Sequence, residues 1–261
     1  HIYNEDLMNI TLYYPHINEQ QKIGEFFRVL DERIANQERK IAKVKALKSA
    51  YLTEMFPQEG ETAPKRRFKG FVEEWQVWLV NDIGNSTYGG GTPKTTNDQY
   101  WGGNIPWIQS SDLIDDSLYI NTPTKNITEL GLAKSAAKLV PANSIAVVTR
   151  VGVGKLAFMP YEYSTSQDFL SISNLNVDYQ FGAYVMYNLL KKEKESVQGT
   201  SIKGITKDKL LSMKLMVPND KEEQQKIGQF FKNLDNQITT EEKKLEKLKK
   251  MKEAYLEEMF V

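Results

Sequence analysis

The alternation of apolar and polar residues is most regular near the two ends of the chain. Between residues 23 and 55, and again between 227 and 259, apolar side chains recur at alternating steps of three and four. This spacing keeps one face of a helix apolar over several heptads, which is typical of a coiled coil. We therefore predict two long helices of roughly 55 Å each, at about 1.5 Å per residue. Polar residues interrupt the stripes at Gln37 and Lys48, and at Glu241 and Lys252.

We expect these two helices to pair, because a single amphipathic helix of this length cannot bury its apolar face alone. If both helices leave equivalent globular domains related by a two-fold axis, they must run antiparallel. A plain dimerisation coiled coil and a spacer that holds two globular domains apart both fit this pattern. The residues expected in the seam are Ile23, Phe27, Leu30, Ile34, Ile41, Val44, Ile227, Phe231, Leu234, Ile238, Leu245 and Leu248.

The two predicted helices are copies of one sequence. Residues Glu19–Phe56 match Glu223–Phe260 at about 22 of 38 positions, with a constant offset of about 204 residues. The similarity continues upstream, where residues 2–15 align with residues 205–218 and both segments end in proline. The repeating unit is therefore the end of a globular domain followed by a long helix. We expect the chain to be a piece of a longer protein with a further globular domain before residue 1.

The segment between the helices contains short apolar runs separated by Gly, Asn, Asp and Pro. Residues 144–150 and 169–172 predict buried strands, and residues 181–191 predict a helix. We predict an α+β fold in which one globular domain, without a doubly wound sheet, accompanies an antiparallel coiled coil of two long helices. The expected divisions are a domain tail at 1–15, the first helix at 16–57, a polar linker at 58–66, the globular domain at 67–218 and the second helix at 219–261.

Composition argues against several classes of protein. The chain has no Cys, and its two His residues, His1 and His16, lie outside the globular domain, so no catalytic residue and no metal site is predicted. No signal-peptide pattern is visible in these residues, and no apolar run approaches the roughly 20 residues that cross a membrane. We expect a cytoplasmic location, which the absence of Cys fits. Because 34 basic residues balance 34 acidic ones, any DNA-binding role depends on where the cations lie.

Four loops of the globular domain, at residues 88–96, 149–155, 164–168 and 198–206, are rich in glycine, hydroxyl and basic residues. Each loop alone is typical of a surface turn, but four of similar character favour a surface that contacts phosphates and base edges. In the first loop we expect backbone N–H groups to face phosphate. Neither glycine-rich loop has the full signature of a nucleotide site. The candidate DNA-binding residues are Gly91, Thr92, Lys94, Thr95, Arg150, Lys155, Ser166, Gln167, Ser201 and Lys203.

Taken together, these motifs resemble a known family. The repeated element EQQKIG-x-FF-x-x-LD resembles the conserved regions of the specificity subunit of type I restriction–modification systems. The runs GGGTPKT at 89–95, YWGGNIPWIQSSDL at 100–113 and QGTSIKGIT at 198–206 resemble that family's target recognition domain. The family pattern has two recognition domains and two conserved helices. This chain has one complete domain, the tail of another and both helices.

The resemblance implies a non-catalytic subunit that binds no cofactor of its own. The recognition domain would read one half of a split target in double-stranded DNA, while the helices set the spacing and dock methyltransferase subunits. S-adenosylmethionine would bind in those methyltransferase subunits, and nuclease–translocase subunits would complete the complex. Self-association of the chain is a further expectation, and a membrane partner is not. The alternatives are a methyltransferase with a fused recognition domain, whose catalytic motif is missing here, and a coiled-coil scaffold with a protein-binding globular domain.

Overall fold

The computed structural model describes residues 13–120, 122–150, 153–196 and 204–259, with the side chains of residues 195 and 196 left out. Two compact units divide the chain. The helical unit comprises His1–Leu47 and Asn236–Val261, and the globular unit comprises Lys48–Asp235. The predicted divisions followed the ends of the long helices. Packing instead places the last turns of one helix and the first turns of the other in the globular unit.

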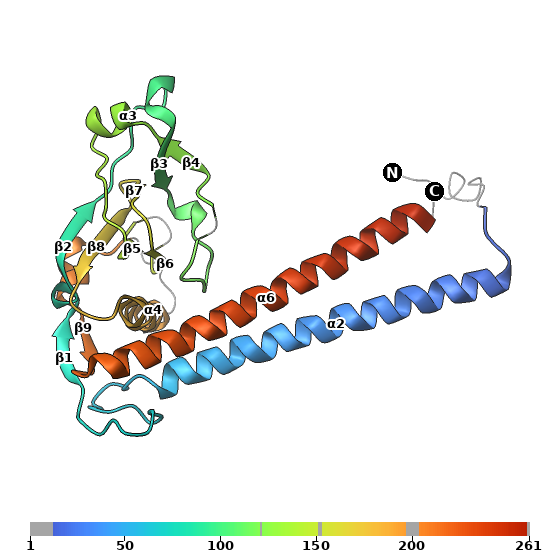
Figure 1. The fold of residues 1–261 in the computed structure, drawn as a ribbon, viewed down its shortest axis with the longest axis horizontal. Coiled ribbons are helices and arrows are strands. Elements are labelled where there is room, and N and C mark those ends of the chain that lie inside the picture. The colour runs from blue at the N-terminus through green and yellow to red at the C-terminus, as the bar shows by residue number, and fades with distance from the viewer. Residues whose placement is uncertain (1–12, 121, 151–152, 197–203, 260–261) are drawn as a thin grey trace. The chain divides into compact units, whose positions relative to one another are not determined.

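Two long helices, α2 (Ile17–Glu54) and α6 (Lys221–Met259), correspond to the two copies of the repeat. Within the helical unit they lie side by side (Figure 1). Residue numbers rise along one helix as they fall along the other, so the predicted antiparallel pairing is confirmed. Ion pairs that cross the seam show this order: Asp31–Lys252 at 2.5 Å, Glu38–Lys249 at 2.7 Å and Lys45–Glu242 at 2.6 Å.

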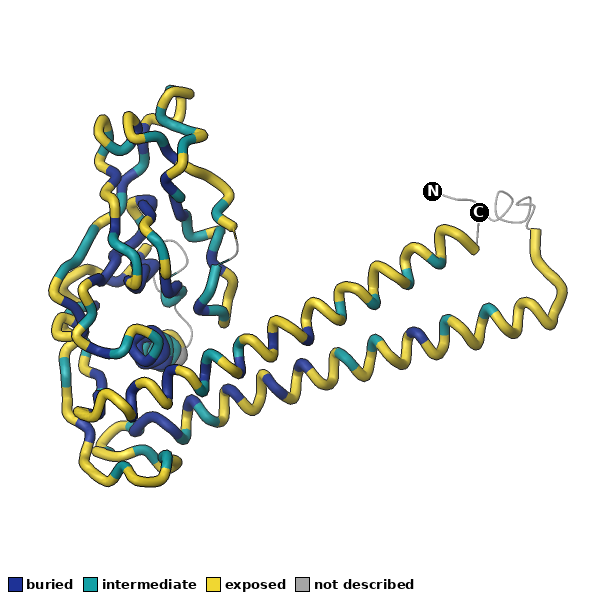
Figure 2. The backbone as a smooth tube through the Cα atoms, viewed as in Figure 1, coloured by how far each residue is buried: buried dark blue, intermediate teal, exposed yellow. Residues whose placement is uncertain are grey.

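Apolar and polar groups share the seam of the helical unit. Gln37 Nε2 donates to Glu241 Oε2 at 2.7 Å and to the Glu241 carbonyl at 2.9 Å. Gln37 and Glu241 are equivalent positions of the repeat, so a pseudo-two-fold axis passes between them. Figure 2 shows buried positions recurring along both helices. Leu30, Ile41, Val44 and Ile238 are buried, whereas Ile23, Phe27, Ile34, Leu245 and Leu248 are half-buried.

The described part of the globular unit is α+β, as predicted, and contains three small sheets. The largest is antiparallel, with strand order β2 (Gly84–Gly89), β8 (Phe169–Leu175), β5 (Ser144–Val148) and β6 (Leu156–Met159). In the second, β3 (Trp101–Ile108) lies between antiparallel β4 (Lys125–Ile127) and parallel β7 (Ser164–Thr165). The third pairs β1 (Gln76–Leu79) with β9 (Lys214–Val217), which Pro218 follows.

Helices of 5 to 18 residues connect the strands. They are α3 (Glu129–Ala133), α4 (Tyr179–Ser196) and α5 (Lys207–Ser212), with 3₁₀ turns at Val80–Asp82, Asp98–Tyr100 and Ser110–Asp112. Thr128 and Thr206 begin α3 and α5 because their hydroxyls accept the free N–H groups of the first turn. Strands β5 and β8 and helix α4 confirm the elements expected from the apolar runs.

Apolar clusters hold the described part of the globular unit together. The first includes Ile108, Val148 and Tyr163 under the four-stranded sheet, and the second surrounds Trp107 and Ile127. The third is aromatic and consists of Phe56, Trp75, Phe181, Tyr184 and Phe231.

Phe231, expected in a helix–helix seam, thus packs against the globular core, with its ring centre 5.2 Å from that of Tyr184. Ile227 and Leu234 are likewise buried in the globular unit. The predicted linker is also tied down, because Arg66 N donates to Glu54 O and Trp75 N donates to Thr62 O, both at 2.8 Å.

Candidate nucleic-acid interface

Loops that are far apart in sequence meet on one part of the globular unit. Gly91 N donates to Thr165 O at 2.8 Å, which joins the glycine-rich loop to the 164–168 loop. Thr149 N donates to Asp168 O at 2.7 Å, and Ile205 N donates to Thr149 O at 2.8 Å. The backbone bonds therefore bring together all four loops that the sequence analysis singled out. The four loops are therefore joined to one another and are not four separate turns.

The glycine-rich loop is a packing element and not an open phosphate cradle. A Cβ atom on Gly90 would overlap Ser166 O, and one on Gly91 would overlap the Ala136 backbone. Gly91 is buried, its N–H is taken by Thr165, and its carbonyl accepts the Trp107 indole N–H at 3.0 Å. The expectation that the Gly91 N–H faces phosphate is therefore wrong, because Thr165 accepts this N–H. Both glycines are present because two other chain segments approach the backbone too closely for a side chain.

The side chains that follow the glycines do reach the surface. Lys94 and Thr95 are exposed. The Trp101 indole N–H donates to Lys94 O at 3.3 Å, which ties the loop to β3. Thr92 Oγ1 donates to the Oε1 of exposed Gln167 at 2.5 Å. These hydroxyl, amide and ammonium groups belong to the residue types that contact phosphates and base edges.

Arg150 extends the exposed set from the end of β5. Its side chain is exposed and has no partner among the described residues. Lys155 differs, because its Nζ lies 3.3 Å from both Leu113 O and Asp115 Oδ1. The charge of Lys155 is thus largely compensated within the unit, which weakens the case for a DNA contact.

Ser166 is a further correction. It is only 4% exposed, its N–H donates to Ile108 O, and its Oγ accepts a long bond from Asp168 N. Its role is to hold the loop on which Gln167 is presented. Ser201 and Lys203 lie outside the described residues.

A neutral, hydrogen-bonded tyrosine, Tyr163, forms part of the floor next to the 164–168 loop. Tyr163 is fully buried between Ser144 and Ser171, with hydroxyl–hydroxyl distances of 3.0 Å to each. Burial raises the pKa of the Tyr163 phenol to about 12, so this group stays neutral at physiological pH. A neutral hydrogen-bonded floor suits a surface that holds its loops in fixed positions.

Two cations were missed by sequence reasoning. Lys207 Nζ donates to Thr87 Oγ1 at 3.0 Å, and Lys125 Nζ lies 5.8 Å from the ring centres of both Trp101 and Trp107. Lys207 directly follows the fourth loop, so a wider window would have included it. Lys125 is brought to the tryptophans by strand pairing, which the local sequence does not reveal.

In the described ranges, no group of three or more His, Asp or Glu side chains could hold a metal ion. A separate observation concerns membranes: within the same ranges, no helix is both long enough and apolar enough to span one.

Comparison with known proteins gives consistent matches. Residues 72–250 match the family described as type I restriction modification DNA specificity domain. The chain is 28% identical over 183 residues to the MjaIX specificity subunit of Methanocaldococcus jannaschii, covering 69% of this chain and 42% of that protein. It is 33% identical over 184 residues to the EcoR124I/EcoR124II specificity subunit of Escherichia coli, covering 66% and 44%. The chain therefore spans less than half of either relative.

A solved structure shares the fold. The HsdS subunit from Thermoanaerobacter tengcongensis superimposes with a TM-score of 0.60 at 17% identity, and the match covers 99% of this chain and 62% of that one. This likeness includes both long helices and the globular unit.

Proposed function

Because the chain belongs to the type I restriction modification DNA specificity domain family, we propose that its globular unit reads one half of a split DNA target. The family consists of specificity subunits and not of enzymes. We therefore assign the chain no reaction of its own, and methylation and cleavage fall to partner subunits. S-adenosylmethionine belongs, in this proposal, to a methyltransferase partner.

The convergence of the four loops is the observation that carries this proposal. Exposed Lys94, Arg150 and Gln167 come from three of the loops that these hydrogen bonds join, which supports a common surface for them. The cations provide sequence-independent attraction to phosphate, while the amide of Gln167 provides a donor and an acceptor for a base edge. The close packing of Gly90 and Gly91 against neighbouring segments limits movement of the glycine-rich loop. A surface of this kind discriminates bases because its donors are positioned before DNA arrives.

The long helices supply the second part of the proposal. A continuous antiparallel pair keeps a fixed length, so it suits a spacer between two recognition elements and a platform for methyltransferase subunits. Nuclease–translocase subunits join the same assembly. Association of this chain with a second copy is a further part of the proposal, because equivalent halves on either side of a two-fold axis favour it.

A selection from randomised DNA duplexes tests the proposed role. The chain, alone and together with methyltransferase subunits, is incubated with the pool, and bound duplexes are sequenced. We expect one short block of bases to be enriched. Arg150→Ala should weaken binding of the selected duplex, while Lys214→Ala, which removes an exposed cation from β9, should leave it unchanged. If no assembly enriches any sequence, the DNA role is wrong and a protein-binding globular unit becomes the better account.

A further inference from the structure

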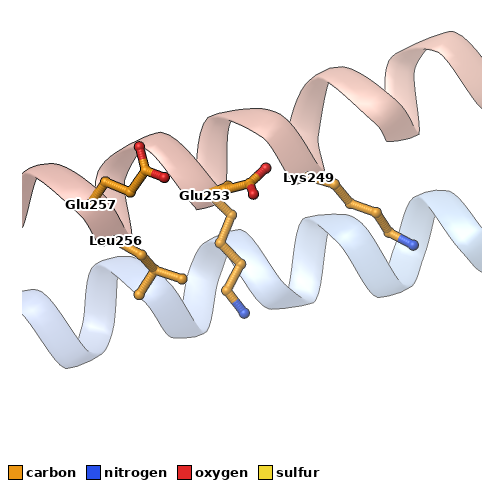
Figure 3. A pocket seen from close by; sticks show the side chains of 5 residues that line it. Lys249, Glu253, Leu256 and Glu257 are labelled. Atoms are coloured by element: carbon orange, nitrogen blue, oxygen red, sulfur yellow. The ribbon is translucent and has the colours of Figure 1, made fainter.

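The two sides of the helical unit's seam differ in charge compensation. On one side, acidic and basic residues alternate between the helices, as in the pairs Glu38–Lys249 and Lys45–Glu242. A hollow of about 550 Å³ continues this side toward the end of α6, where Lys249, Lys252 and Leu256 are accompanied by Glu253 and Glu257 (Figure 3). Each of these two lysines is paired with an acidic residue of α2. This side is electrically balanced and stabilises the helix pair.

The other side of the seam is basic. A second hollow, of about 560 Å³, is lined by Arg33, Asn36, Gln37, Lys40, Lys244, Lys247, Leu248 and Met251. Lys43 and Leu47 extend this set along α2, because they lie seven residues, or about two helical turns, after Asn36 and Lys40. We call this set the axial basic face.

The axial basic face contains five cations, and only two of them contact a carboxylate, that of Glu241. Lys40 and Lys244 both approach Glu241 Oε1 at 3.0 Å, and these contacts leave the two ammonium groups close to one another. Arg33, Lys43 and Lys247 are exposed and have no acidic partner among the described residues. Like charges across a helix pair reduce its stability. Coiled-coil stability therefore does not explain why these cations are grouped on one face.

The repeat places this face on the pseudo-two-fold axis. Lys40 and Lys43 are equivalent to Lys244 and Lys247, so the axis through Gln37 and Glu241 exchanges the two pairs. Leu47 and Met251 are also equivalent, and they flank the cations with exposures of 45% and 36%. These three pairs form a symmetric arrangement with lysines at its centre and apolar side chains at its ends, whereas Arg33, whose equivalent is Gln237, lies outside the symmetry.

We propose that the axial basic face contacts the sugar–phosphate backbone of duplex DNA between the two halves of the target. The inference rests on the proposed function and adds a second, sequence-independent contact to it. Duplex DNA carries one negative charge per about 1.7 Å of its axis, so it attracts an uncompensated group of cations. Duplex backbones also have local two-fold axes, which match the symmetry of this face.

The distribution of residue types favours DNA over a protein partner. Protein interfaces have apolar centres from which lysine is depleted, with polar residues at the rim. Here the order is reversed, because the lysines occupy the centre and Leu47 and Met251 the ends. The neutral residues of the centre, Asn36 and Gln37, belong with Lys and Arg to the types that contact phosphate.

The test is the salt dependence of DNA binding by the chain assembled with its methyltransferase subunits. The variant Arg33→Gln/Lys43→Gln/Lys247→Gln removes three cations and leaves the contacts of Glu241 intact. The slope of log affinity against log salt concentration should become shallower by about 1 for each phosphate that the variant no longer neutralises. Binding of the selected and of a scrambled duplex should weaken by the same factor, so the ratio between them stays constant.

A matched control separates this face from total charge. Arg39→Gln/Lys243→Gln/Lys250→Gln removes the same charge from the backs of the same helices, and its salt slope should equal that of the unmodified chain. An unchanged slope in the first variant would overturn the inference while leaving base recognition intact. Loss of subunit assembly in that variant would also overturn it, since the face would then bind protein. A complex that binds no duplex preferentially before any substitution would instead refute the proposed function itself.

Discussion

The same lysine–aspartate pair occurs twice in this chain, and its two copies have very different surroundings. Lys48 pairs with Asp235 and Lys252 pairs with Asp31, each at 2.5 Å and at equivalent positions of the repeat. In the first pair the side chains are only 7% and 12% exposed, whereas in the second they are 31% and 54% exposed. The repeat thus specifies the ion pair, but the globular unit determines how much it contributes to stability.

Contacts from α4 make the difference. Tyr184 Oη donates to Asp235 at 2.7 Å, and Lys48 Nζ lies 5.8 and 5.4 Å from the ring centres of Tyr184 and Tyr187. Desolvation and the neighbouring Asp235 carboxylate raise the pKa of Tyr184 far above its usual value, so this hydroxyl remains a donor. The buried pair is therefore part of a network that joins both long helices to α4.

The starts of the two helices differ in the same way. Glu223 is fully buried and accepts two bonds from Arg67, at 2.6 and 2.8 Å, whereas its equivalent Glu19 is exposed with no side-chain partner among the described residues. The equivalent glycines also differ. A Cβ on Gly228 would lie 2.7 Å from Phe181 N, while a Cβ on Gly24 would meet nothing within 4 Å.

Removing the lysine from each ion pair should give the largest contrast. Lys48→Met leaves a buried carboxylate without its counter-charge, which should lower the free energy of unfolding by about 3 kcal/mol or more. Lys252→Met removes a solvated pair and should lower it by less than about 1 kcal/mol. Urea denaturation of the two variants measures both values. Equal decreases would mean that the globular unit adds nothing to the first pair.

Adding one methyl group to each glycine should give a smaller contrast, with opposite signs. Gly228→Ala forces the α6 and α4 backbones apart and should destabilise the protein by about 1–3 kcal/mol. Gly24→Ala replaces an exposed glycine inside a helix and should stabilise it by roughly 0.5–1 kcal/mol. Thermal unfolding of the two variants provides the test. Stabilisation by both substitutions would contradict the close packing at Gly228.

The equivalent residues Gln37 and Glu241 provide the smallest contrast, which depends on pH. Hydrogen bonds from Gln37, Lys244 and Lys40 lower the pKa of Glu241 from 4.5 to about 2. Because the folded state favours the ionised carboxylate, its contribution is complete above the unfolded pKa and is lost as the pH falls through about 2. Melting temperature measured against pH should show this decrease, and Glu241→Gln should remove that part of the dependence. An identical acid profile in both proteins would show that Glu241 is not stabilised in this way.

These contrasts also show which features the sequence can predict. The repeat and its apolar spacing predicted two paired helices, because both can be recognised from residues that are close in sequence. The positions of β5, β8 and α4 followed from apolar runs for the same reason. The four loops were recognised from their composition, although their contact with one another depends on long-range backbone bonds such as that of Thr149 with Asp168.

What the sequence did not reveal depends on packing between distant segments. Gly91 and Ser166 have the composition of surface-loop residues, but Ala136 and Ile108 cover or bind them. Likewise, identical lysines at positions 48 and 252 give no sign of their different burial. The axial basic face could not be predicted in this way. Apolar spacing identifies the residues in the seam, but not the charged residues of the two helices that come together beside it.

The most direct test of the account is photo-crosslinking from the 164–168 loop. A photoreactive side chain in place of Gln167 is incorporated into the chain, which is assembled with methyltransferase subunits and bound to its selected duplex. We predict crosslinks to bases within one half of the target, and only background crosslinks when the same side chain replaces Lys214. Equal crosslinking from both positions, or none from position 167, would contradict the claim that the converging loops read DNA.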